Sequence, residues 1–181
     1  LFKDILSLKP GHFIELNGQK ISIHKWYESP PFLESKNDPD KFKNLFFDAV
    51  KIRLRSDVEV GACLSGGTDS SAIVGAVSHA LTTSHISEKG SFKTFSAVFD
   101  DPAISETEYV NAVTKYTNTK NYSFSPNNEL FWKSIPSLIW HNDEPIQSPS
   151  QFIQWTVFEQ AKKQGVKVTL DGQGVDELAA G

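Results

Sequence analysis

The sequence is short of several residue types, and each shortage excludes a class of protein. It contains one cysteine and no methionine among 181 residues, so an internal disulfide is excluded and a reducing compartment is expected. It has no signal peptide and no apolar stretch near the ~20 residues of a membrane helix, which predicts a cytoplasmic protein without a membrane partner. The net charge is −4 and no basic run occurs, so we expect no nucleic-acid partner.

Two common phosphate-binding motifs are also missing. No lysine lies between Lys51 and Lys89, which excludes a Walker loop there, and the dinucleotide fingerprint G-x-G-x-x-G is absent. Residues 60–71, VGACLSGGTDSS, instead predict a buried strand, a turn with paired glycines and a helix that begins at Ser70. Such a turn directs backbone N–H groups at one point, at the positive end of a helix dipole. This arrangement predicts a site for an anion, most simply the phosphates of a nucleotide.

Three residues of this turn support that interpretation. Gly66 and Gly67 allow the backbone to approach a ligand that a side chain would exclude. Asp69 places a carboxylate inside an anion site, as expected if a divalent cation bridges it to phosphate. The alternative is a plain Ser/Gly turn in which Ser70 or Asp69 caps the helix.

A second strand of the same kind lies near the end of the sequence. Residues 166–178, VKVTLDGQGVDEL, predict a strand that runs into a Gly-x-Gly turn with carboxylates, followed by a helix. In an open α/β sheet, both turns lie at the carboxyl ends of strands, where such sheets bind ligands.

The intervening sequence predicts alternating strands and helices. We expect a hairpin over 13–23 with a type I′ turn at Asn17-Gly18. We also expect a helix whose N-terminus has a capping box formed by Ser105 and Glu108, and an exposed polar loop over 82–90. This alternation predicts an α/β fold with a parallel sheet flanked by helices. The remaining expected elements are strands at 58–64, 94–99, 121–124 and 166–170, and helices at 40–55, 70–82, 128–140 and 150–164.

The two turns, in their order along the chain, resemble those in the synthetase domain of the glutamine-hydrolysing asparagine synthetases. This family belongs to the ATP pyrophosphatases, whose pyrophosphate-binding loop the first turn resembles. Residues 95–102 with 105–109, and residues 141–145 with 148–150, resemble two further segments of that family. The resemblance implies an adenine-nucleotide α-hydrolase-like, doubly wound parallel sheet. It also implies a ligase that uses ATP and Mg²⁺ to adenylate the side-chain carboxylate of aspartate, releases pyrophosphate, and then transfers ammonia derived from glutamine.

The resemblance also implies a domain organisation. Residues 1–28 are expected to form a β-hairpin at the junction with a missing N-terminal glutaminase domain, and residues 29–39 a linker. Residues 40–181 are expected to form the ATP-binding synthetase domain, cut at its C-terminus. We therefore expect the chain to be a fragment that is inactive alone, and the thiol of Cys63 to be inert because it lies in a buried strand.

Site residues follow from matching this sequence to the family motifs. The catalytic residues are expected to be Asp69, Asp176 and Gln173, of which Asp69 and Asp176 would hold the metal. The residues expected to bind ATP or pyrophosphate are Cys63, Ser65, Gly66, Gly67, Thr68, Asp69, Ser70, Ala97, Asp171 and Gly172.

Gln173 departs from the family pattern, which has an acidic residue between the two glycines. An amide has no basic lone pair at neutral pH and cannot act as a general base. Either Gln173 positions substrate without taking a proton, or the acceptor is another carboxylate, as in β-lactam or macrolactam formation. A domain that binds ATP without turnover is the alternative outside enzymes.

Overall fold

The fold is described from a computed structural model, which describes residues 2–29, 38–83, 92–101, 103 and 105–175. The chain divides into two compact units, Leu1–Asp38 and Pro39–Gly181. Each unit is described by itself below.

The first unit contains an antiparallel hairpin of β1 (His12–Asn17) and β2 (Lys20–Lys25). Asn17 pairs with Lys20, so the loop consists of Gly18 and Gln19 rather than Asn17 and Gly18. Only Gly18 of these residues has a positive φ, +60°. A type I′ turn needs positive φ at both loop residues, so the type I′ prediction was wrong, and the loop has the φ pattern of type II′.

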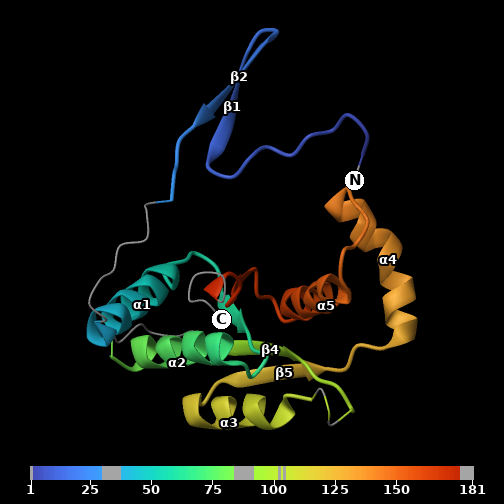
Figure 1. The fold of residues 1–181 in the computed structure, drawn as a ribbon. Helices are drawn as coiled ribbons and strands as arrows, with labels where there is room; N and C mark the ends of the chain where they lie inside the picture. Colours follow the sequence, from blue (N-terminus) through green and yellow to red (C-terminus); the bar gives the residue numbers. More distant parts are fainter. Residues whose placement is uncertain (1, 30–37, 84–91, 102, 104, 176–181) are drawn as a thin grey trace. The chain divides into compact units, whose positions relative to one another are not determined.

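The second unit is built on a parallel sheet in the order β5-β4-β3-β6 (Figure 1). The strands are β3 (Val60–Cys63), β4 (Lys93–Ala97), β5 (Lys120–Phe124) and β6 (Val168–Leu170). The helices are α1 (Pro39–Arg53), α2 (Thr68–Thr83), α3 (Thr107–Thr117), α4 (Asn128–Asn142) and α5 (Pro149–Lys163).

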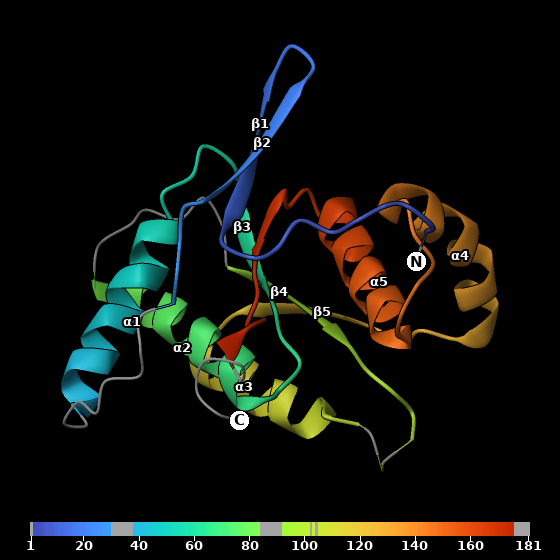
Figure 2. The same ribbon diagram turned by 45° about the horizontal axis from the view of Figure 1, so that its top comes forward.

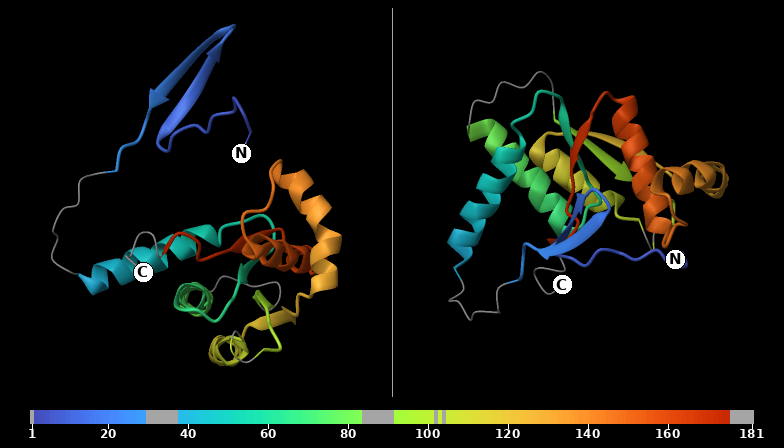
Figure 3. Two further views of the ribbon diagram at one scale, coloured as in Figure 1. Left: turned by 45° about the vertical axis from the view of Figure 1, so that its right-hand side comes forward. Right: turned by 90° about the horizontal axis from the view of Figure 1, so that it is seen from above.

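Helices cover both faces of this sheet, which confirms the α/β fold (Figure 2). Ala62 and Leu64 are buried in one apolar cluster with residues of α1, α2 and α3. Phe95 is fully buried in a second cluster with Val157 and Ala161 of α5. Side chains alternate along a strand, so successive residues point to opposite faces of the sheet. Helix α4 packs beyond α5, on the same side of the sheet (Figure 3).

The order of the strands contains a reversal. The chain builds β3, β4 and β5 outward in one direction and then returns to place β6 on the free side of β3. Ligands of open α/β sheets bind outside the carboxyl ends of strands at such a reversal. The two turns predicted as a site follow β3 and β6, the two strands that flank it.

Most expected elements are present within a few residues, and the differences have local causes. Helix α2 begins at Thr68, two residues before the predicted start, because the turn is tighter than expected. The capping box is wrong: Glu106 occupies the N-cap of α3 without a side-chain cap, and Ser105 Oγ lies 2.9 Å from Thr107 Oγ1. The predicted polar loop lies outside the described residues from 84 to 90.

No helix among the described residues has both the length and the apolar character needed to cross a membrane.

Gly66 is predicted to contribute to the stability of the fold. Its φ is +96°, and an added Cβ would lie 2.9 Å from Tyr109 Cβ and 3.1 Å from Glu106 O. Gly66→Ala should therefore lower the free energy of unfolding by about 1–3 kcal/mol in urea titrations. Gly75→Ala is the matched control: an added Cβ meets nothing within 4 Å, so a gain of about 0.5–1 kcal/mol is expected. Equal stabilities of the two variants would contradict the packing role of Gly66.

Candidate nucleotide-binding site

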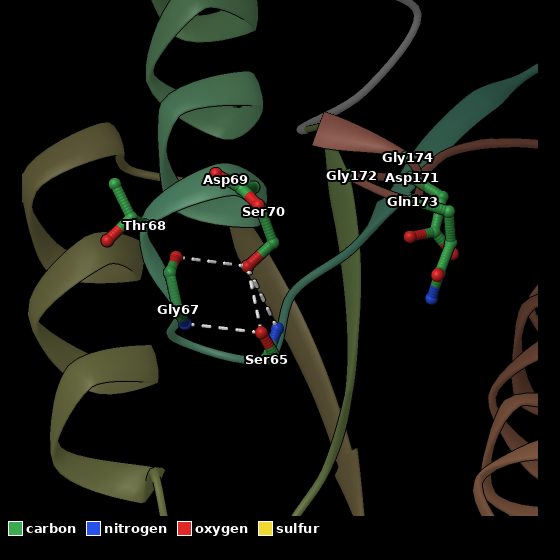
Figure 4. Close-up of a pocket in the computed structure, with 9 residues that line it drawn as sticks. All are labelled: Ser65, Gly67, Thr68, Asp69, Ser70, Asp171, Gly172, Gln173 and Gly174. Atoms are coloured by element: carbon green, nitrogen blue, oxygen red, sulfur yellow. Dashed lines mark hydrogen bonds between the residues drawn. The ribbon is translucent and has the colours of Figure 1, made fainter. Parts of the chain in front are cut away.

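The first turn is held in shape by its own serine hydroxyls (Figure 4). Ser70 Oγ accepts a hydrogen bond from Ser65 N at 3.3 Å and donates one to Gly67 O at 3.3 Å. Ser65 Oγ lies 3.0 Å from Ser70 Oγ and accepts a hydrogen bond from Gly67 N at 3.2 Å. Both hydroxyls therefore fix the conformation of the turn.

These bonds also decide which N–H groups can meet a ligand. The N–H groups of Ser65 and Gly67 already have partners inside the turn. In the first helical turn the situation differs, because N–H groups there have no carbonyl four residues earlier within the helix. In α2 these are the N–H groups of Thr68, Asp69 and Ser70, at the positive end of the helix dipole. An anion is thus expected over the start of α2 rather than over the whole turn.

The second turn lies beside the first because β6 pairs with β3. Val60, Gly61 and Ala62 are paired with Val168, Thr169 and Leu170, so the next residue, Asp171, follows beside Cys63. Gly172 makes this approach possible: an added Cβ would lie 3.0 Å from Asp69 Cβ and 3.3 Å from Ser70 N. A side chain at this position would push the two turns apart.

The two turns enclose a polar cavity of about 430 Å³ (Figure 4). Among the described residues that line it, the charged side chains are the carboxylates of Asp69 and Asp171, and none is a lysine or arginine. The lining residues are Ser65, Gly67, Thr68, Asp69, Ser70, Asp171, Gly172, Gln173 and Gly174.

A second cavity of about 580 Å³ adjoins the first and is more apolar. Ser65, Ser70, Asp171 and Gln173 line both cavities, so the two spaces share a boundary. The second cavity lies between the carboxyl ends of β3 and β4 and the helix α5. Its other lining residues are Cys63, Leu64, Phe95, Ala97, Phe99, Glu106, Ser150, Gln151, Ile153, Gln154 and Val157.

The structure brings most of the predicted site residues to these two cavities. Cys63 and Ala97 line the apolar cavity, and the turn residues line the polar one. Gly66 is the exception: it faces α3 instead, where Tyr109 and Glu106 leave no room for a side chain. The conformation and packing at this position therefore require glycine whether or not a ligand binds beside it. Asp176 lies outside the described residues.

Sequence reasoning missed the contribution of α5. Gln151 and Gln154 line the apolar cavity, and Gln154 Nε2 donates a hydrogen bond to Asp171 Oδ2 at 3.1 Å. Within the sequence these glutamines stand in an ordinary helix, without a motif that separates them from surface residues.

The thiol of Cys63 is held in its neutral form. Burial raises the pKa of the Cys63 thiol from 9.0 to about 12, and the nearby negative charge of Asp171 adds to the effect. A neutral thiol is a poor nucleophile, so Cys63 is chemically inert at neutral pH. As the pH rises, the thiol ionises at a lower pH in the unfolded chain than in the folded protein. The neutral Cys63 thiol therefore contributes to the free energy of unfolding below pH 9, and this contribution decreases as the pH rises toward 12.

No group of three or more His, Cys, Asp or Glu side chains that could hold a metal ion occurs in the described part of the chain. Asp69 is the one described residue among the two predicted metal ligands.

A parallel sheet with a strand-order reversal, and with two glycine turns at that point, defines an α/β domain of the adenine-nucleotide α-hydrolase-like type. A solved structure of an NH3-dependent NAD synthetase from Campylobacter jejuni has this fold. It aligns with a TM-score of 0.51 over 79% of this chain and 60% of its own, at 14% sequence identity.

The asparagine synthase family model matches residues 41–181, so the chain belongs to the asparagine synthase family. A putative glutamine-hydrolysing asparagine synthetase 2 from Methanocaldococcus jannaschii is 35% identical over all of this chain and 35% of its own length. Glutamine-hydrolysing asparagine synthetase 1 of Bacillus subtilis is 30% identical over 98% of this chain and 27% of its own length. The chain thus spans about a third of these curated relatives.

Cys63 provides a chemical test of the site geometry. At pH 9 we expect slow alkylation of Cys63 in the native protein and fast alkylation in denaturant, followed by peptide mass spectrometry. Asp171→Asn should accelerate the native reaction, because it removes the neighbouring charge that helps raise the thiol pKa. Asp48→Asn, an exposed carboxylate on α1, is the control and should leave the rate unchanged. Equal rates in both variants would show that Asp171 does not act on Cys63.

Proposed function

We propose that the chain is the ATP-binding part of a glutamine-dependent asparagine synthetase, which adenylates the side-chain carboxylate of aspartate. The observation that supports this most is the polar cavity between the turns after β3 and β6, with the start of α2 at its wall. Membership of the asparagine synthase family supports the same conclusion.

The two cavities suit different parts of ATP. The polar cavity offers first-turn N–H groups and the positive end of the α2 dipole, which favour the β- and γ-phosphates. The adjoining apolar cavity offers Phe95, Phe99 and Ala97, which favour the flat adenine ring. ATP bound in this way would extend from one cavity into the other, with its α-phosphate near the residues that line both.

The acidic lining of the polar cavity requires a cation if polyphosphate binds there. Mg²⁺ is held in proteins by one or two carboxylates together with substrate phosphates, so a complete cage of protein ligands is not needed. Asp69, in the first turn of α2, fits this requirement, and Asp176 is the second ligand that we propose. Bound there, Mg²⁺ would neutralise phosphate charge.

The first reaction step that we propose is the adenylation of aspartate. An oxygen of the aspartate side-chain carboxylate attacks the α-phosphorus of ATP and forms a new P–O bond. The bond between the α-phosphorus and the oxygen that bridges to the β-phosphorus breaks, and pyrophosphate leaves with that electron pair. The first-turn N–H groups of α2 stabilise the leaving pyrophosphate, so catalysis rests on positioning and electrostatics.

The second step forms the amide. Ammonia attacks the acyl carbon of the aspartyl adenylate, a proton leaves the nitrogen, and the C–O bond to AMP breaks. Gln173 lines both cavities but cannot accept that proton, because an amide is not basic at neutral pH. We assign Gln173 a positioning role toward the acceptor or ammonia.

The source of ammonia lies beyond the described site. We propose that a glutaminase domain supplies ammonia in the parent protein, that residues 1–28 form the hairpin at its junction, and that residues 29–39 link it to the ATP-binding domain. The single cysteine, Cys63, lines the apolar cavity with a neutral thiol and is not a glutaminase nucleophile. We propose the cytoplasm as the compartment, since one free thiol suits a reducing environment.

Gly67 tests the phosphate assignment. An added Cβ at Gly67 has one neighbour within 4 Å, Ser65 Oγ at 3.3 Å, a tight contact that a small shift of this hydroxyl relieves. Gly67 lines the polar cavity, so a larger side chain there reduces the space for phosphate. In the full-length protein, Gly67→Val should abolish aspartate-dependent ATP–pyrophosphate exchange and MgATP binding by calorimetry. Its unfolding transition should stay close to that of the parent. The Gly75→Ala variant is the control and should retain exchange. Undiminished exchange in Gly67→Val would overturn the phosphate assignment.

Gln173 tests the acceptor. If aspartate is the acceptor, Gln173→Glu should preserve exchange and increase amide formation, because it adds a proton acceptor. If another carboxylate is the acceptor, the new charge should repel it and slow the reaction. For charges ~4 Å apart, the repulsion is about 1–4 kcal/mol, or roughly 5- to 1,000-fold in rate. Pyrophosphate release from a panel of carboxylates, measured on both proteins, separates these outcomes. Identical profiles would show that Gln173 does not contact the acceptor.

A further inference from the structure

The peptide unit between Leu64 and Ser65 joins the end of β3 to the first turn, and both of its polar atoms are hydrogen-bonded. Leu64 O accepts a hydrogen bond from Ser96 Oγ of β4 at 2.6 Å. Ser65 N donates one to Ser70 Oγ, at the start of α2, at 3.3 Å. A peptide unit is planar, so its C=O and N–H groups rotate together. The hydroxyl of Ser96 therefore restricts the direction of an N–H group inside the first turn.

Ser96 lies beneath the site and is not part of its surface. The residue is 1% exposed and is not among the residues that line the polar or the apolar cavity. Leu64 N donates to Phe95 O at 2.9 Å, so β4 holds Leu64 through both its N–H and its C=O group. Any effect of Ser96 on a ligand must consequently pass through the peptide unit between Leu64 and Ser65.

The number of protons shows which bond the Ser96 hydroxyl makes. This hydroxyl has one proton and two oxygen neighbours, Leu64 O at 2.6 Å and Asn121 Oδ1 of β5 at 3.0 Å. Asn121 Oδ1 also accepts a hydrogen bond from Thr94 Oγ1 at 3.0 Å. The Ser96 proton therefore belongs to Leu64 O, the nearer acceptor, because Thr94 supplies a proton to Asn121.

Thr94 matches Ser96 in every respect except the contact with Leu64. The two residues are two positions apart on β4, so their side chains lie on one face of the sheet. Both are buried, and both hydroxyls lie 3.0 Å from Asn121 Oδ1. Of the two, Ser96 is the one that reaches Leu64 O. Comparing them separates a role in the first turn from a role in the core.

We propose that Ser96 is a positioning residue that holds the peptide unit between Leu64 and Ser65 in the orientation in which the first turn binds phosphate. Through Ser65 N, this orientation holds Ser70 Oγ, which donates to Gly67 O (Figure 4). Without the Ser96 hydroxyl, the first turn occupies this orientation for a smaller fraction of the time. The apparent affinity for phosphate then decreases by that fraction. The inference rests on the proposed binding of ATP phosphates beside this turn.

Two variants of the full-length protein test the inference. Ser96→Ala removes the bond to Leu64 O, and Thr94→Val is the matched control, because it removes a neighbouring hydroxyl without touching the first turn. Both should lower the midpoint of urea unfolding, since each leaves a buried acceptor without its donor. Ser96→Ala alone should also weaken MgATP binding in calorimetry, by about 3- to 10-fold. Its KM for ATP in exchange assays should increase by the same factor, with little change in kcat.

A second measurement on the same variants does not depend on ATP. In the protein without ligand, amide hydrogen exchange at residues 65–67 should be faster in Ser96→Ala, because the released peptide unit frees Ser65 N from Ser70 Oγ. Thr94→Val should keep the exchange rate of the parent at these residues. Ser96→Thr retains the hydroxyl and should restore both the slow amide exchange and the affinity for MgATP.

The contrary results can be told apart. Equal losses of MgATP affinity in Ser96→Ala and Thr94→Val would show a general effect of the core. Unchanged amide exchange at residues 65–67 in Ser96→Ala would show that the hydroxyl does not orient the first turn. Either result would overturn the inference while MgATP binding by the parent protein stands. Parent protein that binds no MgATP would overturn the proposed function and the inference with it.

Discussion

The parallel pairing of β3 with β6 is the contact on which the candidate site depends. It brings a turn at residues 64–67 next to a turn more than 100 residues later, at residues 171–174. Gly172 permits the approach, since a side chain there would collide with Asp69. The polar cavity exists only because these two turns face each other across the strand-order reversal.

The sheet can carry this site because its two faces are covered independently. Ala62 and Leu64 pack toward α1, α2 and α3, while Phe95 packs toward α5. Cys63, the last residue of β3, lies between the buried Ala62 and Leu64 and belongs to the α5 face, where the apolar cavity opens at the ends of the strands. The same alternation that builds the core therefore also decides which side chains line the cavity.

The first turn shows how a binding loop is stabilised before any ligand arrives. The hydroxyls of Ser65 and Ser70 satisfy two N–H groups and a carbonyl within the turn. The N–H groups at the start of α2 are left for an anion, in a conformation that is already fixed. For the phosphate binding that we propose, such preorganisation would reduce the entropic cost of ordering the loop.

The sequence by itself determined the α/β class, the family and the positions of the two turns. Apolar β-branched strands, paired glycines and helix starts are local patterns, and each depends on residues that are neighbours in the chain. The sequence could not separate the roles of Gly66 and Gly67: Gly66 faces α3, whereas Gly67 lines the polar cavity. Nor could it identify Gln154 as the partner of Asp171. These features were decided by the tertiary structure alone, because they depend on which strands pair and which helix covers which face.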